Sequence, residues 1–369
     1  MTKVELITLH RVKNYGSVLQ AYATQTILNK LGYDVEIIDY YPKRYTKVGM
    51  LSRIKKQNKL LEKNIIFRVA ARIIIYPSYI LRFRTFNKFL KKYLVLSPMT
   101  YKNELELAKN LPNGDIFMTG SDQVWNSEWN GGIDNCLFLN IPNVNNKIAY
   151  ASSFGKSKLD DSEKEITRKL LQDYKHISLR ETSGVKICDD LGIKDTVNVL
   201  DPTLLLDSHE WEKIASNKYD GQNYILTYNL NRNSKIDNYA KNLSKKTGLK
   251  VKYLSYQLHD VFKNGKMYCN PCVEDFLSLI KNATYVITDS FHATAFSINF
   301  KRKFIIVYPG KYSTRLQSIL KILKLENRVA KDENDLDIAI GNIDYSGVYK
   351  KLEVERNKSI DWLCKNLKK

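Results

Sequence analysis

Short apolar strands that end directly before a helix recur along this 369-residue sequence, and this alternation limits the chain to an α/β fold. Residues 3–9 alternate as a strand does, a helix opens at Gly16-Ser17 and ends at Gly32, and residues 35–40 form the next strand. A strand, a helix and a second strand in this order join through a right-handed crossover. We therefore expect the strands to be parallel.

The same pattern occurs in two series that separate near Pro202. The sequence predicts strands at residues 115–119, 147–153, 176–179 and 197–200 in the first series and at 224–228, 250–254, 285–288 and 304–307 in the second, with helices at 234–247 and 272–282. We expect two Rossmann-like αβα domains that face a cleft, at residues 1–203 and 204–345. Residues 346–369 are expected to form a helix that packs back on the first domain.

A strongly basic segment, at about residues 46–98, interrupts the first series. Within residues 50–96, twelve lysines and arginines stand against one acid, Glu62, and apolar residues are interleaved with them. This pattern predicts one or two basic amphipathic helices, broken near Pro77. Such helices can lie on an anionic membrane, or they can form an inserted unit with a solvated basic face. The aromatic residues follow helical spacing, which disfavours a stacking platform for nucleic acid.

Composition restricts the partners and the compartment. The net charge of +20 indicates an anionic partner. The sequence has no apolar run of about 18 residues and no signal-peptide pattern, so we expect a cytoplasmic protein, at the inner face of the membrane if residues 50–96 bind lipid. Five scattered cysteines fit a reducing compartment. Cys269 and Cys272 are spaced like a zinc-binding pair, but a second pair is missing, so no metal site is expected.

Polar side chains at the ends of the predicted strands are the candidate site, because ligands of open α/β sheets bind at the carboxyl ends of the strands. Asp289 and His292 follow the strand at 285–288, and Arg180 follows an earlier strand. A histidine can transfer protons, and the fork of an arginine matches phosphate or carboxylate. We expect Arg180 to lie in the cleft without a protein partner. The alternatives are a histidine that caps a helix and an arginine that pairs with Glu181.

Other candidates lie beside the same strand ends. A phosphate or a sugar can approach the backbone amide of Gly16, where the chain turns into a helix. Asp122 and Asp289 can orient a histidine or bind sugar hydroxyls, although helix capping is the commoner role of such residues. Lys311 and Arg315 can add positive charge. No GxGxxG motif is present in the sequence, which argues against dinucleotide binding.

Several segments together resemble the polysaccharide pyruvyl transferase family. They are NYGSVLQAYATQ with LGYDVEIIDY, DIFMTGSDQVWN, KIAYASSFG, SLRETSG, VLDPTLLL, TDSFHATAFS and YPGKYSTRLQSIL, and they extend from Asn14 to Leu320. GSDQVWN and TDSFHATAFS are the specific ones. The resemblance implies a glycosyltransferase-B-like fold. It also implies transfer of pyruvate from phosphoenolpyruvate, as a ketal, to a sugar of a bacterial surface polysaccharide or of its lipid-linked precursor.

The resemblance also implies roles for the candidate residues. Catalysis falls to His292, as general acid and base, with Asp289. Donor binding falls to Gly16, Ser17, Arg180, Ser290, Lys311 and Arg315, and acceptor binding to Ser121, Asp122, Gln123 and Trp125. Phosphoenolpyruvate is the co-substrate, and no other cofactor and no metal are implied.

One position departs from the family pattern. Relatives carry an arginine close before the histidine, in a Ser-x-Arg-Leu-His-like pattern, whereas Phe291 precedes His292 here. Arg11, Lys311 or Arg315 would then replace the missing cation, or the donor would differ. Two alternatives stay open: a nucleotide-sugar-dependent glycosyltransferase of the same fold, and a non-catalytic lectin-like or membrane-scaffold protein in which residues 50–96 are the functional part.

Overall fold

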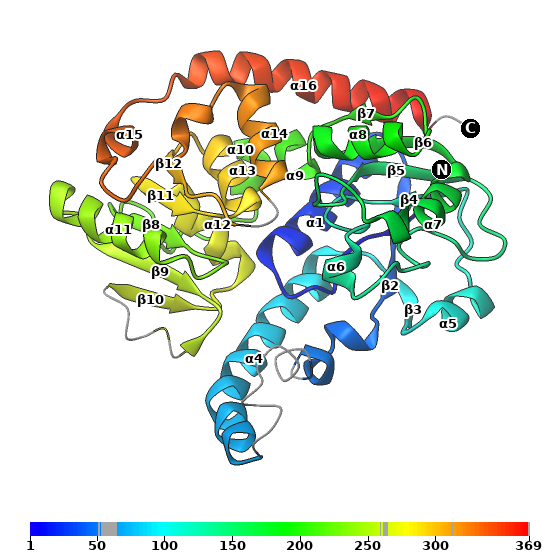
Figure 1. Cartoon of the computed structure of the whole chain (residues 1–369), viewed down its shortest axis with the longest axis horizontal. Coiled ribbons are helices and arrows are strands. Elements are labelled where there is room, and N and C mark those ends of the chain that lie inside the picture. Colours follow the sequence, from blue (N-terminus) through cyan, green and yellow to red (C-terminus); the bar gives the residue numbers. More distant parts are fainter. Residues whose placement is uncertain (51, 53–64, 259, 261–264, 311–312, 368–369) are drawn as a thin grey trace.

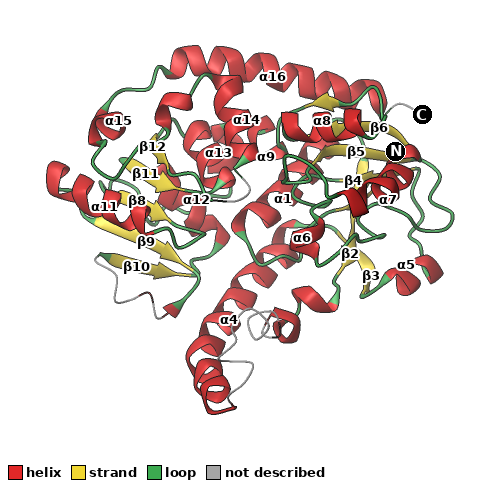
Figure 2. Ribbon diagram, viewed as in Figure 1, coloured by secondary structure: helices red, strands yellow, loops and turns green. Residues whose placement is uncertain are grey.

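Two parallel β-sheets form the framework of the molecule (Figures 1 and 2). The computed structural model describes residues 1–50, 52, 65–258, 260, 265–310 and 313–367. The first sheet has the order β3-β2-β1-β4-β5-β6-β7, with β1 (Lys3–Ile7), β2 (Asp34–Tyr40), β3 (Leu96–Tyr101), β4 (Ile116–Thr119), β5 (Lys147–Ser152), β6 (Tyr174–Leu179) and β7 (Val197–Asn198). The second has the order β10-β9-β8-β11-β12, with β8 (Ile225–Tyr228), β9 (Val251–Ser255), β10 (Lys266–Cys269), β11 (Tyr285–Thr288) and β12 (Lys303–Ile306). The predicted fold class is confirmed.

Helices connect the strands and cover the sheets. In chain order they are α1 (Tyr15–Lys30), α4 (Ile65–Tyr93), α5 (Glu104–Lys109), α6 (Ser127–Asn130), α7 (Asp161–Gln172), α8 (Thr182–Asp190), α9 (Pro202–Leu205), α10 (Ser208–Glu212), α11 (Ser234–Thr247), α12 (Val273–Lys281), α13 (Phe291–Asn299), α14 (Thr314–Leu323), α15 (Leu336–Ile340) and α16 (Tyr345–Asn366). Short 3-10 turns lie at Lys43–Tyr45 and Glu326–Arg328.

Each sheet has a point at which its strand order reverses. In the first sheet β1 pairs with β2 on one side and with β4 on the other, so that Val4 stands opposite both Val35 and Ile116. In the second sheet β8 pairs in the same way with β9 and β11. Right-handed crossovers leave such a point in opposite directions, which opens a crevice at the carboxyl ends of the two central strands.

Aromatic packing joins the two halves. Tyr15, in the first turn of α1, is fully buried, and its ring stacks on Phe276 of α12 with 4.3 Å between ring centroids. The Tyr15 hydroxyl donates a hydrogen bond of 2.7 Å to the carbonyl of Pro271. A buried aromatic pair in this arrangement contributes more than its buried area alone. The start of α1 is therefore fixed against the second half of the chain.

The C-terminal helix α16 crosses the top of the molecule over both halves (Figure 1). The backbone amide of Leu200 donates to the Ser359 hydroxyl at 3.0 Å, and the ring of Trp362 lies 5.9 Å from that of Tyr150. These contacts confirm that the C-terminal helix packs back on the first domain. It also holds the second half, because the Tyr349 hydroxyl donates to the carbonyl of Asn299 at 2.6 Å.

Helix α4 is one continuous helix through Pro77, so the predicted break there is wrong. Pro77 has no amide to donate to the carbonyl of Ile73, but Ile73 is 70% exposed, so solvent can satisfy that carbonyl. The C-terminal half of α4 is packed through Phe83, Phe86, Phe89 and Leu90, whereas its N-terminal half projects from the body (Figure 1). The projecting half therefore offers the apolar side chains of Val69, Ile73 and Ile74 to the surroundings.

The packed half of α4 also contacts the second half of the chain. The Thr85 hydroxyl donates to the carbonyl of Asn270 at 3.0 Å, and the amide of Leu258 donates to the Ser78 hydroxyl at 3.0 Å. The basic insertion is thus a bridge between the domains at this end. No helix in the described part of the chain is long and apolar enough to cross a membrane.

Candidate active site

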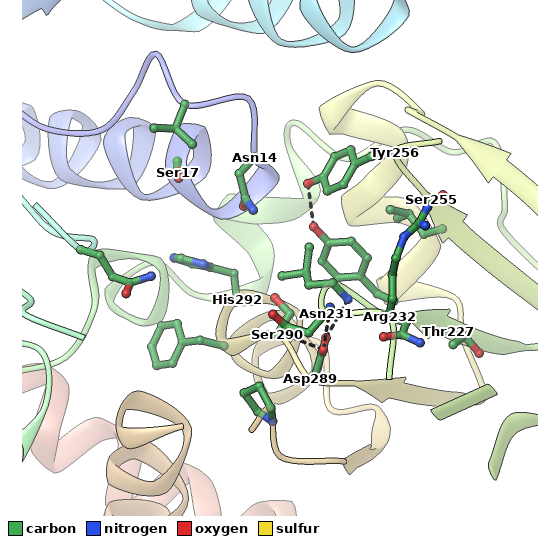
Figure 3. Close-up of a pocket in the computed structure, with 18 of the residues that line it drawn as sticks. Asn14, Ser17, Thr227, Asn231, Arg232, Ser255, Tyr256, Asp289, Ser290 and His292 are labelled. Atoms are coloured by element: carbon green, nitrogen blue, oxygen red, sulfur yellow. Dashed lines mark hydrogen bonds between the residues drawn. The ribbon is translucent and has the colours of Figure 1, made fainter. Parts of the chain in front are cut away.

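A cleft of about 370 Å³ opens at the carboxyl ends of the strands that flank both reversal points. This volume lies at the lower end of the range for small-molecule sites. The loop before α1 and the loop after β4 line the cleft from the first sheet, and the loops after β8, β9 and β11 line it from the second. Figure 3 shows Asn14 and Ser17 on the α1 side, Tyr256 and Asn231 on the other side, and His292 directed toward α1.

His292 lies in the first turn of α13, where the Ser290 hydroxyl caps the helix by accepting from the amide of Ala293 at 3.3 Å. The helix cap is thus Ser290 and not Asp289, for which the sequence left the capping role open. The imidazole is held against α1, since a Cβ at Gly16 would stand 1.9 Å from its Nδ1 atom. The position thus requires glycine, and Gly16 serves His292 rather than exposing an amide.

The Nε2 atom of His292 has no hydrogen-bond partner among the described residues. It lies 3.8 Å from an oxygen of Asp201, which is too long for a hydrogen bond but close enough for a strong charge interaction. His292 lines the cleft although its Nε2 atom is buried, so the ring lies beside a bound molecule with which a histidine can exchange a proton.

Arg180 is fully buried and does not line the cleft, so the expectation of a cleft cation without a protein partner is wrong. Its guanidinium lies 3.0 Å from Asp201, 3.3 Å from Asp122 and 4.0 Å from Glu181. Three strand ends supply these carboxylates, which is why they converge. The pairing with Glu181 that we considered is the weakest of the three contacts.

The same cluster keeps its acids ionised. Burial opposes ionisation of Asp201, but His292, Arg180 and Thr203 together hold the pKa of Asp201 well below its ordinary value. Burial also opposes ionisation of Asp122, and Arg180 and His292 lower the pKa of Asp122. Asp122 and Asp201 therefore both stay charged in the interior, beside Arg180 and His292.

Arg315, on α14, is the cation that reaches the cleft beside this cluster. Its Nε atom is buried and has no hydrogen-bond partner among the residues described. Burial and the nearby charge of Arg180 together lower the pKa of Arg315 to about 10, and the charge of Asp122 opposes both effects. The guanidinium is therefore charged at neutral pH and available to an anion. Lys311, the neighbouring candidate, lies outside the described residues.

Asp289 anchors a loop. Its carboxylate accepts from the amides of Leu230 and Asn231 at 2.8 and 2.9 Å and from the Asn231 side chain at 2.8 Å, as Figure 3 shows. Burial raises the pKa of Asp289, and these hydrogen bonds counteract the effect. The residue lines the cleft, but its oxygens are occupied by the loop after β8.

The four acceptor candidates separate into two groups. Asp122 and Gln123 line the cleft, and the Ser17 hydroxyl donates to Asp122 at 2.6 Å. The Ser121 hydroxyl points away to Asp201, at 2.8 Å. Trp125 is buried in the core, where it stacks on Phe138, so it does not line the cleft.

Two residues of the cleft wall were not predicted from the sequence. Trp129, four residues after Trp125, lines the cleft and is 37% exposed. Arg82 of α4 lines the opposite part, with its guanidinium carbon 3.8 Å above the ring of Tyr256. Nothing in the sequence separates Arg82 from the other basic residues of the insertion. In the described part of the chain, no group of three or more His, Cys, Asp or Glu side chains is placed to hold a metal ion.

Solved structures with the same architecture share little sequence identity with this chain. The chain is similar to S. aureus MnaA in a structure with UDP (11% identity, 95% of this chain and 91% of that chain covered, TM-score 0.54). It is also similar to UDP-GlcNAc 2-epimerase from Neisseria meningitidis bound to UDP-GlcNAc (12% identity, 100% and 99% covered, TM-score 0.51). At this identity the likeness establishes the fold, which is glycosyltransferase-B-like. A comparison with curated proteins found no match.

The match to a protein-family model is more specific than the likeness to solved structures of the same fold. The model of the polysaccharide pyruvyl transferase family matches residues 14–311, which include Asn14 with the whole of α1, the loop after β4, the Arg180 cluster and the whole of α13. Most of the cleft lining lies in this range, and Arg315 lies beyond it. The chain therefore belongs to the polysaccharide pyruvyl transferase family.

Proposed function

We propose that this protein transfers pyruvate from phosphoenolpyruvate, as a ketal, to a sugar of a bacterial surface polysaccharide or of its lipid-linked precursor. The observation that carries the proposal is that His292 and Arg315 line one cleft, and that each has a buried nitrogen with no hydrogen-bond partner in the described part of the chain. The imidazole of His292 can deliver a proton, and the Arg315 guanidinium can hold an anion. An enol phosphate that must be protonated on carbon needs both.

In the proposed reaction each proton has a defined source and destination. His292, as imidazolium, protonates the methylene carbon of the donor, and the adjacent carbon becomes electrophilic. A sugar hydroxyl attacks that carbon and returns its proton to His292. A second hydroxyl then attacks the same carbon, the bond to the phosphate oxygen breaks, and phosphate leaves with the proton of that hydroxyl. The products are the cyclic ketal and inorganic phosphate.

Asp201 and Arg180 act through other residues. Asp201, 3.8 Å from His292, stabilises the imidazolium, and Arg180 keeps Asp201 ionised in the interior. Phe291 fills the position at which relatives carry an arginine: its ring lies 5.0 Å from the Arg180 guanidinium and 5.1 Å from the His292 ring. Arg315 supplies the donor-binding cation instead.

The acceptor occupies the part of the cleft beyond His292. Gln123 and Asp122 line it from the first sheet and can bind sugar hydroxyls. Ser290 and Ser17 keep the local backbone in place, as the cap of α13 and as the partner of Asp122. Ser121 and Trp125 shape the wall from behind.

The projecting half of α4 supports a peripheral contact with an anionic membrane. Val69, Ile73, Ile74 and Tyr76 are exposed there, in a segment of the sequence with a large excess of basic residues. Exposed apolar groups among cations are the combination that binds an anionic bilayer surface. We place the protein in the cytoplasm, at the inner face of the membrane, where a lipid-linked precursor is accessible.

The test is ligand-induced thermal stabilisation combined with phosphate release. A ligand that binds the folded state at 100 times its Kd raises stability by about 2.7 kcal/mol. Phosphoenolpyruvate should raise the Tm of the wild type and of His292→Asn, but not that of Arg315→Gln. Acceptor-dependent phosphate release should disappear in both variants. Lys321→Gln, an exposed change on the same helix, is the matched control.

A different pattern contradicts the proposal. Stabilisation by a nucleoside-diphosphate sugar with no response to phosphoenolpyruvate would indicate the nucleotide-sugar-dependent glycosyltransferase. Stabilisation by neither, with vesicle binding intact, would indicate the non-catalytic scaffold.

A further inference from the structure

A second cavity lies in the other half of the chain, where the end of α14 and the start of α16 line it together. Its volume is about 160 Å³, and none of the residues that line it also lines the cleft. Arg315, which lines the cleft, is in the first turn of α14, whereas Lys324, which lines the cavity, follows the last residue of that helix. About 13 Å of helix lies between these two residues, so the cavity is separate from the cleft.

Arg328 is the buried cation of this cavity. It ends the 3-10 turn Glu326–Arg328 and is only 3% exposed. Its Nε atom donates to the carbonyl of Phe304, near the amino end of β12, at 3.1 Å. Its Nη2 atom is buried and has no hydrogen-bond partner among the described residues, and no acid in that part of the chain forms an ion pair with Arg328. One nitrogen of the guanidinium is thus held in place while another is unpaired.

An unpaired charge in the interior costs stability, and burial accordingly lowers the pKa of Arg328. A guanidinium nevertheless stays protonated in proteins. An arginine that only ties the loop to β12 needs no more than its bond to Phe304, and this leaves the cost of the unpaired Nη2 atom standing. Because Arg328 lines the cavity, a small anion bound there would supply a hydrogen-bond acceptor and a countercharge together.

The rest of the lining also favours an anion. Lys324 and Lys351 join Arg328 there against one acid, Asp344, so three cations and one acid give the lining a net charge of +2. Asp344 caps α16 by accepting from the amide of Gly347 at 3.1 Å. Lys351 is half-buried, and its Nζ atom donates to the carbonyl of Gly347 at 3.3 Å, so it is held beside the first turn of α16. The positive end of the dipole of this 22-residue helix adds to the charge of the lysines.

We propose that this cavity binds a phosphate group, held by Arg328 together with Lys351 and Lys324 beside the start of α16. The volume lies below the range of sites for drug-sized ligands, so the cavity suits a small tetrahedral anion. The fork of an arginine matches phosphate oxygens. Two sources supply this chemistry, inorganic phosphate and a small phosphate ester. The site does not depend on the proposed function, because none of its residues takes part in that reaction.

The experiment is a calorimetric titration of inorganic phosphate into Arg315→Gln, in which the cleft has lost its own anion-binding cation. This protein should still bind one phosphate. Adding Arg328→Gln should weaken the binding tenfold or more, as expected for the loss of charge-assisted hydrogen bonds. Lys351→Gln in the same background should weaken it severalfold. Lys350→Gln removes the same charge from an exposed neighbour that does not line the cavity, and it should leave the affinity unchanged.

Three results overturn the proposal: no binding of phosphate to Arg315→Gln, binding that Arg328→Gln leaves intact, or an equal loss in Lys350→Gln. If Arg328→Gln does not fold, Lys351→Gln decides in the same way. Glycerol 3-phosphate, titrated into the same proteins, distinguishes the two sources. Tighter binding than inorganic phosphate, lost with Arg328, assigns the site to a phosphate ester, and weaker binding assigns it to the free ion. Turnover is not measured in these titrations, so failure of the proposed function leaves their outcome unaffected.

Discussion

Gly16→Ala is the sharpest test of how the cleft positions its histidine. The added methyl carbon would stand 1.9 Å from Nδ1, 2.3 Å from Cγ and 2.5 Å from Cε1 of His292. Ordinary contacts between such atoms begin near 3.4 Å, so the ring must retreat by about 1.5 Å. That movement takes the imidazole away from α1 and changes its approach to a bound donor.

The effects on stability and on catalysis should differ in size. Alanine is favoured over glycine within a helix by about 1 kcal/mol, whereas crowding in a packed site costs about 1–3 kcal/mol. The free energy of unfolding should therefore fall by no more than about 2 kcal/mol. A catalytic group displaced by about 1 Å loses about 100-fold in rate, which corresponds to about 2.7 kcal/mol of activation free energy.

The assay is acceptor-dependent phosphate release, with urea unfolding and phosphoenolpyruvate-induced thermal shift on the same samples. Gly16→Ala should fold, bind the donor through Arg315 and lose about 100-fold in kcat. Gly347→Ala, in the first turn of α16, is the control for a crowded methyl at a helix start, because its added carbon would stand 2.5 Å from an oxygen of the capping Asp344 and not beside His292. A Gly16→Ala protein with wild-type kcat would refute the assignment of His292 as the proton donor.

Three further predictions concern the cluster, the first sheet and α4. Asp201→Asn should lower the free energy of unfolding by about 3–5 kcal/mol at neutral pH. Because the folded-state pKa of Asp201 is lowered, the stabilisation by its carboxylate is present above about pH 4 and disappears in more acid solution. Urea unfolding curves of the wild type and of Asp201→Asn should therefore converge as the pH falls below about 4. Burial raises the folded-state pKa of Glu5 to about 7, so ionisation of Glu5 destabilises the wild type as the pH rises from about 4.5 to 7. Glu5→Gln should therefore raise the Tm at pH 8 and change the Tm little at pH 4. An equal shift of the Tm at both pH values would contradict the burial argument. Changing Ile73 and Ile74 to Ser should reduce cosedimentation of the protein with phosphatidylglycerol vesicles at low salt. Ile166→Ser, at an exposed position on α7, is the control. A wild-type protein that stays in solution when these vesicles are sedimented contradicts the membrane contact.

Most of the fold could be predicted because its signals are local. The strand at Tyr285–Thr288 and the helix at Ser234–Thr247 have the predicted bounds, since an apolar run and a capped amphipathic pattern mark them. The edge strands β3 and β10 were not predicted. β3 contains Pro98 and several exposed residues, and β10 is four residues long, so neither has the apolar pattern of a central strand.

The site could be predicted only where one residue carries the information. His292 lies in the cleft because it follows a central strand directly. Whether Arg180 is paired with acids depends on which strands are neighbours in the sheet. Its partners Asp122, Glu181 and Asp201 follow different strands whose ends the fold brings together. Arg82 depends on how α4 crosses to Tyr256, which no local pattern records.

The position of α16 has a consequence for synthesis on the ribosome. The first sheet is complete in the chain at Asn198, but the Tyr33 hydroxyl, the Tyr150 ring and the Leu200 amide also make contacts with residues 359–367, which are synthesised much later. At about 5–20 residues per second, these surfaces stay uncovered for roughly 10–30 s, until residues 359–367 have been synthesised. A nascent chain that stops early therefore exposes the surface that α16 later covers, and interrupted synthesis should yield products that aggregate rather than a working first domain.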